Sequence, residues 1–216
     1  MPDLSYLLTA LGAYLLGSIP FGYLVAKAKG IDIRSVGSGN IGATNAMRVL
    51  GKPAGIFVLL MDAAKGYAAV KIFSIILMKA PPVFEPEWHS YHCIQIIAGV
   101  FAVLGHNYTC WLKFKGGKGI ATTAGVYLAL APWALLVALV VFIFALLLTK
   151  YVSVGSIAAA IALPITVWVM TPNNLFLCLV TTALGFLAVW KHKGNIQRLK
   201  AGTENRLGQK KSEGAK

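Results

Sequence analysis

The amino-acid sequence predicts an all-α integral membrane protein with seven transmembrane helices, and three observations support this fold class. The chain has 216 residues, of which 57% are hydrophobic and only 12% are charged, about half the charged fraction of a soluble domain. Its mean hydropathy is +0.71. The apolar residues gather in runs that approach the roughly 20 residues needed to cross a bilayer.

The charge balance limits the classes of molecule that the protein is expected to bind. Twenty Lys and Arg against seven Asp and Glu give a net charge of +13, which is typical of proteins that bind nucleic acid, a membrane surface or an anionic substrate. Nucleic acid is excluded because the apolar runs leave no free basic face. The three cysteines lack metal-binding spacing, so we expect no metal site and no disulfide framework. We expect one multi-span domain over residues 1–208 and a disordered basic tail over 209–216.

Seven apolar segments are expected to form the spans. The run 120–148 has 29 residues, about 43 Å as a helix, which is too long for one crossing. Ala131-Pro132 divides it, so we interpret it as two helices. The first segment follows no basic region, so we expect a retained helix and not a cleaved signal. The expected segments are 4–26, 53–78, 94–112, the two halves of 120–148, 154–170 and 175–190.

Basic residues set the expected orientation. With seven spans, the connections at 27–52, 113–118 and Lys150 and the tail from 191 lie on one side and hold 17 of the 20 Lys and Arg. The opposite connections, which include Glu85 and Glu87, hold none. The positive-inside rule therefore predicts an external N-terminus and a cytoplasmic C-terminus. If 120–130 were re-entrant and another span were lost, the orientation would be the same.

Three cytoplasmic segments are rich in glycine and small polar residues, and the first is 35–48. Its glycines allow close backbone approach, and its short polar side chains with Arg48 predict an anion-binding nest of amide groups. A helix, not a strand, precedes it, which argues against a dinucleotide fingerprint. Ala43-Thr44 stands where a P-loop needs Lys and Ser or Thr. The alternative is a flexible polar linker.

The second segment, 113–119, sets three lysines around Gly116, Gly117 and Gly119 at the start of a helix, where amide groups and the helix dipole favour anions. We expect Gly117 to need a positive φ. The alternative is a basic membrane anchor. His106, just before this segment, is interpreted as a core histidine and not as a ligand.

The third segment, 191–205, places His192, Asn195 and Arg198 on one helical face, with Gly202 as the helix cap. The alternative is a juxtamembrane helix that binds anionic lipid headgroups. Two other features lie in or beside the spans. Asp62 and Lys65 are expected to neutralise each other. Ser153 and Ser156 lie at the entrance of a span, where helix capping explains them equally well.

In this order and spacing, Gly-Ser-Gly-Asn-Ile-Gly-Ala-Thr-Asn, Lys-Phe-Lys-Gly-Gly-Lys-Gly and Ala-Gly-Thr-Glu-Asn resemble the bacterial acyl-phosphate:glycerol-3-phosphate acyltransferase family over essentially the whole chain. The resemblance implies catalytic roles for Ser38, Arg48, His192 and Asn195, and a structural role for Glu204. The expected acyl-phosphate-binding residues are Gly39, Asn40, Gly42, Ala43, Thr44 and Asn45. The expected glycerol-3-phosphate-binding residues are Lys115, Gly116, Gly117, Lys118, Gly119, Ser153, Ser156 and Arg198. The chain departs from the family at Lys193-Gly194, where a charged pair is expected.

The resemblance implies transfer of a fatty acyl group from acyl phosphate to glycerol 3-phosphate, which gives lysophosphatidic acid and phosphate and opens phospholipid synthesis. It also implies a bacterial inner-membrane enzyme with a cytoplasmic active site, no cofactor, and functional coupling to the enzyme that makes acyl phosphate. Phosphate is already a good leaving group, so no covalent nucleophile is needed. The general base is either His192 or the substrate's own phosphate, and we favour the phosphate. The alternative functions are a transporter or flippase for a phosphorylated lipid, and a basic membrane scaffold.

Overall fold

The structure of the chain is a computed structural model that describes residues 2–78 and 88–208. The expected external connection around Glu85 and Glu87 and the basic tail 209–216 lie outside the described residues. Within the described ranges every regular element is a helix. The helices are α1 (Pro2–Ser18), α2 (Phe21–Lys27), α3 (Ala43–Leu50), α4 (Lys52–Met78), α5 (Trp88–Asn107), the 3₁₀ turn Cys110–Leu112, α6 (Ile120–Leu130), α7 (Pro132–Thr149), α8 (Val152–Met170), α9 (Leu175–Lys191) and α10 (Lys193–Lys200).

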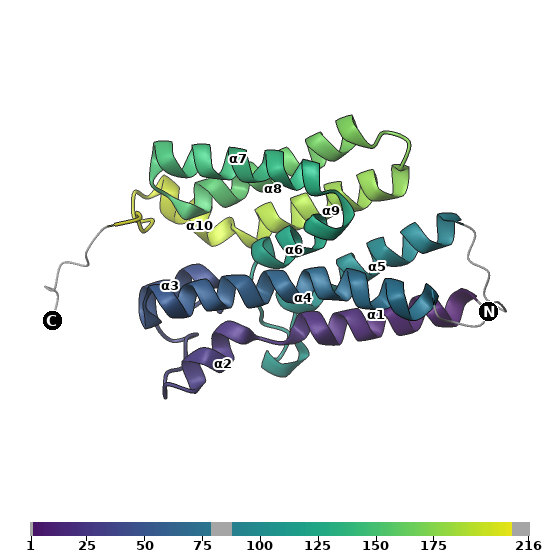
Figure 1. The fold of residues 1–216 in the computed structure, drawn as a ribbon. Coiled ribbons are helices and arrows are strands. Elements are labelled where there is room, and N and C mark those ends of the chain that lie inside the picture. The colour runs from purple at the N-terminus through teal and green to yellow at the C-terminus, as the bar shows by residue number, and fades with distance from the viewer. Residues whose placement is uncertain (1, 79–87, 209–216) are drawn as a thin grey trace, which may run out of the picture.

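The long helices form two groups with a short helix between them (Figure 1). In one group α1 packs on α5, and α4 packs on both. In the other group α8 packs between α7 and α9. The short helix α6 contacts α4 and α5 on one side and α7 on the other. The three shortest helices, α2, α3 and α10, gather at one end of the bundle, where the expected cytoplasmic segments therefore meet.

By length and composition, four helical stretches of the described chain can cross a membrane: Leu4–Lys27, His92–Leu112, Pro132–Thr149 and Val152–Met170. Leu175–Lys191 with Lys193–Lys200, bent by 49°, makes a fifth if the pair counts as one span. Helix α6 has 11 residues, about 16 Å, which is short of a 30 Å hydrocarbon core. All seven expected segments contain a helix, and the number that cross stays a prediction.

One expected helix is broken. The segment 4–26 was expected to be continuous, but α1 ends at Ser18 and α2 begins at Phe21. The physical reason is Pro20, which has no amide hydrogen and clashes with the preceding turn of a helix. Two other expected features are confirmed. The run 120–148 divides at Ala131-Pro132, and Gly202 follows the end of α10 with a φ of 67°.

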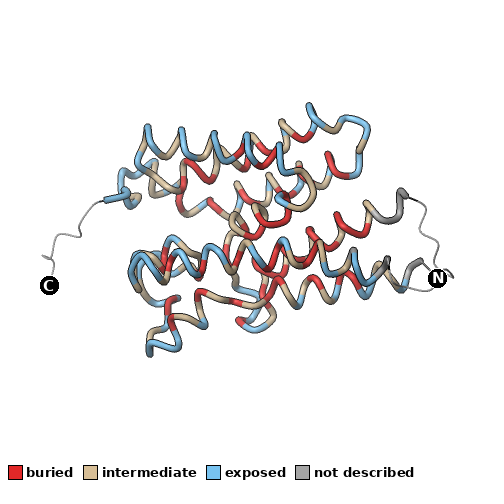
Figure 2. Tube along the Cα trace, in the orientation of Figure 1, coloured by how far each residue is buried: buried red, intermediate tan, exposed pale blue. Residues whose placement is uncertain are grey.

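Small residues let the helices approach closely. A Cβ atom on Gly17 of α1 would overlap the carbonyl oxygen of Ala102 on α5, and one on Gly125 of α6 would overlap the carbonyl oxygen of Ala63 on α4. Such contacts between small residues are the usual way in which membrane helices pack. The buried residues lie between the helices, and the outer faces are exposed (Figure 2). Because those faces carry large apolar side chains such as Phe144 and Leu147, they suit a lipid environment.

Candidate active site

A cavity of about 160 Å³ opens at the end of the bundle where α3 and α10 lie. This volume is far larger than the roughly 10–15 Å³ that one water requires. All three glycine-rich segments contribute to its walls. The lining residues are Ser38, Asn40, Gly42, Ala43, Thr44, Asn45, Arg48, Leu59, Asp62, His106, Lys118, Gly119, Ile120, Ala121, Phe142, Val152, Ser153, Ser156, His192, Asn195, Arg198, Glu204 and Asn205.

The first wall is a loop held together by one buried amide. Oδ1 of Asn45 accepts a 2.8 Å hydrogen bond from the backbone amide of Ser38. Nδ2 of Asn45 donates to three backbone carbonyl groups of the loop, at 2.9–3.2 Å. Gly37 and Gly39 have φ angles of 63° and 70°, which favour glycine. The loop is therefore a fixed turn, which argues against a flexible linker, and the amide of Asn45 is fully occupied inside it.

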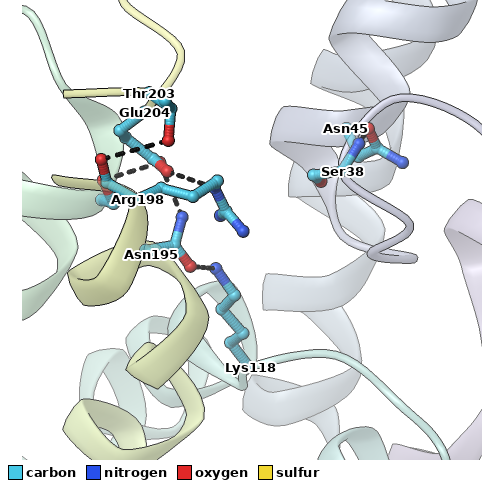
Figure 3. A network of polar contacts seen from close by, with 8 residues as sticks. Ser38, Asn45, Lys118, Asn195, Arg198, Thr203 and Glu204 are labelled. Atoms are coloured by element: carbon cyan, nitrogen blue, oxygen red, sulfur yellow. Dashed lines mark hydrogen bonds and ion pairs between the residues drawn. The ribbon is translucent and has the colours of Figure 1, made fainter. Parts of the chain in front are cut away.

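The opposite wall is organised by a carboxylate (Figure 3). Oε1 of Glu204 accepts hydrogen bonds from Ser153 at 2.9 Å and from Asn195 at 2.7 Å. Oε2 of Glu204 lies 2.7 Å from Nε of Arg198. These hydrogen bonds favour the charged form and hold the pKa of Glu204 below its usual value, against the opposing effect of burial. Ser153 is thus committed to Glu204, and Ser156 donates to the carbonyl oxygen of Val152, so neither serine caps α8.

The end of α10 brings Glu204 to this place. Past Gly202 the amide of Thr203 donates 2.9 Å to the carbonyl oxygen of Arg198, and the amide of Gly202 donates to that of Leu199. This pair of bonds is a Schellman cap, and it turns the chain back over α10. The amide of Leu207 then donates 2.8 Å to the carbonyl oxygen of Lys150. The third segment is therefore joined to the turn between α7 and α8.

The second segment packs on the end of α5. The amides of Gly116 and Gly117 donate to the carbonyl oxygens of Asn107 and His106, at 3.2 and 2.9 Å. A Cβ atom on Gly117 would overlap the imidazole of His106. The expectation of a positive φ at Gly117 is wrong: of the three motif glycines only Gly119 has one, at 81°. Position 117 requires glycine because the imidazole of His106 leaves no room for a side chain.

Lys118 crosses the cavity. Its ammonium group donates a hydrogen bond to Oδ1 of Asn195 and so links the second and third segments (Figure 3). Burial lowers the pKa of Lys118 to about 8, although the negative charge of Glu204 opposes the shift. Within the described part of the chain, no carboxylate lies within 4.0 Å of the cationic groups of Lys118 or Arg48. These cations can therefore bind an anion in the cavity.

His192 has a defined tautomer. The side chain lies between α9 and α10, and Nδ1 is 2.8 Å from the carbonyl oxygen of Ala188. A carbonyl oxygen only accepts, so in the neutral ring Nδ1 carries the proton. Nε2 is then left as an acceptor on the ring that lines the cavity.

Most of the expected site residues meet in this cavity, and a few do not. Four lie outside its lining: Gly39, Lys115, Gly116 and Gly117. Gly39 forms the turn of the first segment, and Lys115 is exposed. All four expected catalytic residues and the expected structural carboxylate line it. They are Ser38, Arg48, His192, Asn195 and Glu204.

Two residues of the cavity wall, Asp62 and His106, are not among the expected site residues. Asp62 and Lys65 form the expected ion pair, at 2.8 Å, but Asp62 also lines the cavity. His106 is buried, as expected for a core histidine, and it too lines the cavity. The signal that could have identified them is the cost of placing ionisable side chains in apolar helices, which makes each one a candidate functional residue.

An apolar cavity of about 70 Å³ adjoins the first and shares Ile120 and Phe142 with it. It lies between α6, α7, α8 and α9. Its lining residues are Ile120, Thr123, Ala124, Leu135, Ala138, Leu139, Phe142, Ala159, Ala160, Leu163, Thr181, Leu184, Gly185 and Ala188. A polar, cationic cavity therefore lies next to an apolar one.

Comparisons with known proteins agree with this architecture. Residues 7–202 match the model of the glycerol-3-phosphate acyltransferase family. A glycerol-3-phosphate acyltransferase of Desulforamulus reducens is 45% identical over 98% of this chain and 100% of its own length. One of Geotalea daltonii is 46% identical over 93% and 97%. A crystal structure of PlsY, an integral membrane glycerol 3-phosphate acyltransferase in its glycerol 3-phosphate form, superposes with a TM-score of 0.82 at 39% identity, over 94% of this chain and 96% of that one.

Proposed function

The chain belongs to the glycerol-3-phosphate acyltransferase family, and from this premise we propose that it transfers a fatty acyl group from acyl phosphate to glycerol 3-phosphate. The products are lysophosphatidic acid and inorganic phosphate. The chain is an integral membrane acyltransferase of phospholipid synthesis. Membership of an enzyme family favours catalysis over the alternatives of a lipid transporter, a flippase or a scaffold.

One observation carries the choice of substrates. The cavity has cationic side chains on facing walls, with Arg48 from the first segment and Lys118 and Arg198 from the second and third. Two of these, Arg48 and Lys118, have no carboxylate within ion-pair distance among the described residues. Two phosphate groups held close together need such charges, because each would otherwise repel the other. Acyl phosphate and glycerol 3-phosphate together meet that description.

The reaction requires positioning more than covalent help. The glycerol hydroxyl oxygen attacks the acyl carbonyl carbon, the bond from that carbon to the phosphate oxygen breaks, and the hydroxyl proton passes to the departing phosphate. Arg48, with the backbone amides of the first segment, stabilises charge on that phosphate. Lys118 and Arg198 hold the phosphate of glycerol 3-phosphate. Fixed substrate geometry accounts for a large part of the rate.

We assign His192 to the alignment of the attacking hydroxyl. Its Nδ1 is occupied by the carbonyl oxygen of Ala188, so Nε2 is an acceptor for the hydroxyl proton. The phosphate of the donor remains the final proton acceptor in this scheme. Ser38 lies on the exposed edge of the first segment, where its hydroxyl can donate to a phosphate oxygen.

The acyl chain has a place beside the polar cavity. The apolar cavity between α6 and α9 shares Phe142 and Ile120 with the site of transfer, so an acyl group whose carbonyl carbon lies among the cations can continue into it. The proposed seven-span topology, with the basic connections on the inner side, favours a site at the cytoplasmic face of a bacterial inner membrane. A donor delivered from the membrane favours functional coupling to the enzyme that makes acyl phosphate.

Purified protein tests this proposal directly. Acyl phosphate and radiolabelled glycerol 3-phosphate are mixed with the enzyme, and labelled lysophosphatidic acid and free phosphate are measured. Equal amounts of the two products are expected. Acyl-CoA in place of acyl phosphate is expected to give little product, because the first segment lacks a nucleotide-binding pattern. Comparable turnover with acyl-CoA would contradict the proposed donor.

A further inference from the structure

Three ionisable side chains lie inside the bundle and take no part in the proposed chemistry. They are Asp62 and Lys65 on α4 and His106 on α5, with 2%, 4% and 5% of their surface exposed. Nζ of Lys65 lies 2.8 Å from Oδ1 of Asp62, and Nδ1 of His106 lies 3.5 Å from the same oxygen. We call these three residues the buried ion network. Placing such groups in apolar helices is costly, and they are rarely present without a function.

One end of the buried ion network holds the broken first helix. Nζ of Lys65 donates a 2.7 Å hydrogen bond to the carbonyl oxygen of Ile19, which lies at the break between α1 and α2. The helix is interrupted at Pro20, and the carbonyl oxygen of Ile19 also accepts a 3.2 Å hydrogen bond from the amide of Phe21. Lys65 adds a second donor to this carbonyl, and this contact is structural. It does not explain the presence of His106.

The other end of the buried ion network reaches the active-site cavity. The carbonyl oxygen of His106 accepts the 2.9 Å hydrogen bond from the amide of Gly117, and the imidazole packs so closely on Gly117 that no side chain fits there. Lys118 is the next residue, and its ammonium group reaches Asn195 across the cavity. Both Asp62 and His106 line the same cavity as Lys118.

We propose that His106 is a positioning residue that sets where Lys118 enters the cavity. This proposal rests on the proposed role of Lys118 in binding glycerol 3-phosphate. The imidazole packs against the backbone of the second segment at Gly117, and Asp62 lies 3.5 Å from Nδ1 of the ring as its charged neighbour. With the ring displaced, the segment shifts and Lys118 no longer meets the phosphate. The alternative is that the network only balances buried charge and stabilises the fold.

A double-mutant cycle separates these two roles. His106→Gln, Lys118→Met and the double variant are compared with the parent enzyme in the radiolabelled assay. Misplacement of about 1 Å can cost a hundredfold in rate, so His106→Gln is expected to lower kcat/KM for glycerol 3-phosphate by about tenfold to a hundredfold. In the Lys118→Met background the same change is expected to have little further effect. Multiplying effects would overturn the positioning role.

A matched control removes a buried polar contact that does not reach the cavity. Oγ1 of Thr109 donates a 2.6 Å hydrogen bond to the carbonyl oxygen of Ser18, which joins the chain after α5 to the end of α1. Thr109→Val is expected to lower Tm and leave kcat and KM unchanged. His106→Gln is expected to change kcat/KM whatever its effect on Tm. Parent-like kcat/KM in His106→Gln overturns the inference.

A second measurement needs no change at Lys118. The pKa of Lys118 is lowered to about 8 mainly by burial, so a displaced, better hydrated Lys118 titrates at higher pH. The alkaline limb of kcat/KM in His106→Gln is therefore expected to move upward from that of the parent. An alkaline limb at the same pH in both enzymes would contradict the displacement of Lys118.

The Lys118→Met variant separates a failure of this inference from a failure of the proposed function. If Lys118→Met keeps full activity, the proposed role of Lys118 fails, and the role of His106 fails with it.

Discussion

Nδ2 of Asn195 donates a 2.7 Å hydrogen bond to Oε1 of Glu204. This contact fixes the side-chain amide of Asn195, whose Oδ1 accepts a hydrogen bond from the ammonium group of Lys118. The carboxylate of Glu204 thus orients side chains from two helices, Ser153 of α8 and Asn195 and Arg198 of α10. The relationship predicts that Glu204 acts on activity through geometry, without touching a substrate.

Glu204→Gln tests this role. The amide of glutamine can accept on one side only, so it meets either Nε of Arg198 or Nδ2 of Asn195 donor to donor. We expect kcat/KM to fall by about tenfold, or about 1.4 kcal/mol, and Glu204→Ala to fall further. The control is Asp32→Asn, which removes an exposed ion pair with Arg34 and is expected to change little. Equal effects of the Glu204 and Asp32 variants would contradict the model.

The same carboxylate gives a pH dependence of stability. Its hydrogen bonds lower the pKa of Glu204 below the ordinary value of 4.5, so its contribution is fully present above that value. The contribution is lost as the pH falls through the lowered pKa of the folded state. The difference in Tm between parent and Glu204→Gln is therefore expected at neutral pH and should shrink on acidification below 4.5.

The ionisation of Lys118 is expected to set the decline of kcat/KM at alkaline pH. Burial lowers its pKa to about 8; Glu204 raises it, and Arg198 and Arg48 lower it further. As the pH rises through this value the ammonium group becomes neutral and loses its attraction for phosphate. We expect kcat/KM for glycerol 3-phosphate to decline above about pH 8, and Lys118→Arg to extend activity to higher pH because the guanidinium stays charged. An identical limb in both enzymes would assign it to another group.

Local features of the fold could be predicted from the sequence, and distant contacts could not. The break before Pro132, the cap at Gly202 and the Asp62–Lys65 pair each depend on residues within one or two helical turns. The bond from Ser153 to Glu204 spans 51 positions, and the ring of His106 meets Gly117 only because the second segment folds back on α5. The break at Pro20 has a local signal, but the continuous apolar run around it conceals it.

Gly117 gives a prediction that differs from the expectation for an anion-binding glycine. A methyl group there collides with the imidazole of His106, so Gly117→Ala is expected to lower both Tm and kcat/KM. The matched control is Gly194→Ala in α10, where the nearest atom to a new Cβ is 3.6 Å away. Alanine favours a helix by about 0.5–1 kcal/mol over glycine, so this variant should be as stable as the parent or more so, with unchanged activity. A parent-like Gly117→Ala enzyme would disprove the close contact.

The orientation in the membrane is tested by labelling single cysteines in a background without Cys93, Cys110 and Cys178. Ser35 lies in the first basic segment, and Asn173 lies in the uncharged turn between α8 and α9. Because the proposed seven spans put 17 of 20 basic residues on one side, Ser35→Cys is expected to react only after the membrane is made permeable. Asn173→Cys should react with an impermeant reagent in intact cells. The reverse labelling pattern would show that the active site lies on the external side of the membrane.

The apolar cavity is expected to determine which acyl-chain lengths the enzyme prefers. Ala159 on α8 lines this cavity and its neighbour Ala158 does not, since adjacent residues of a helix point about 100° apart. Ala159→Leu fills part of the space with three added carbon atoms. It is expected to lower kcat/KM for long-chain acyl phosphates more than for short-chain ones, because burial of each lost methylene contributes about 0.8 kcal/mol. The ratio of kcat/KM values for two chain lengths is the measurement, since it is insensitive to the fraction of active protein. Ala158→Leu adds the same volume outside the cavity and should leave that ratio unchanged. If both variants shift the ratio equally, or neither does, the acyl chain lies elsewhere, along the lipid-facing surface of the bundle.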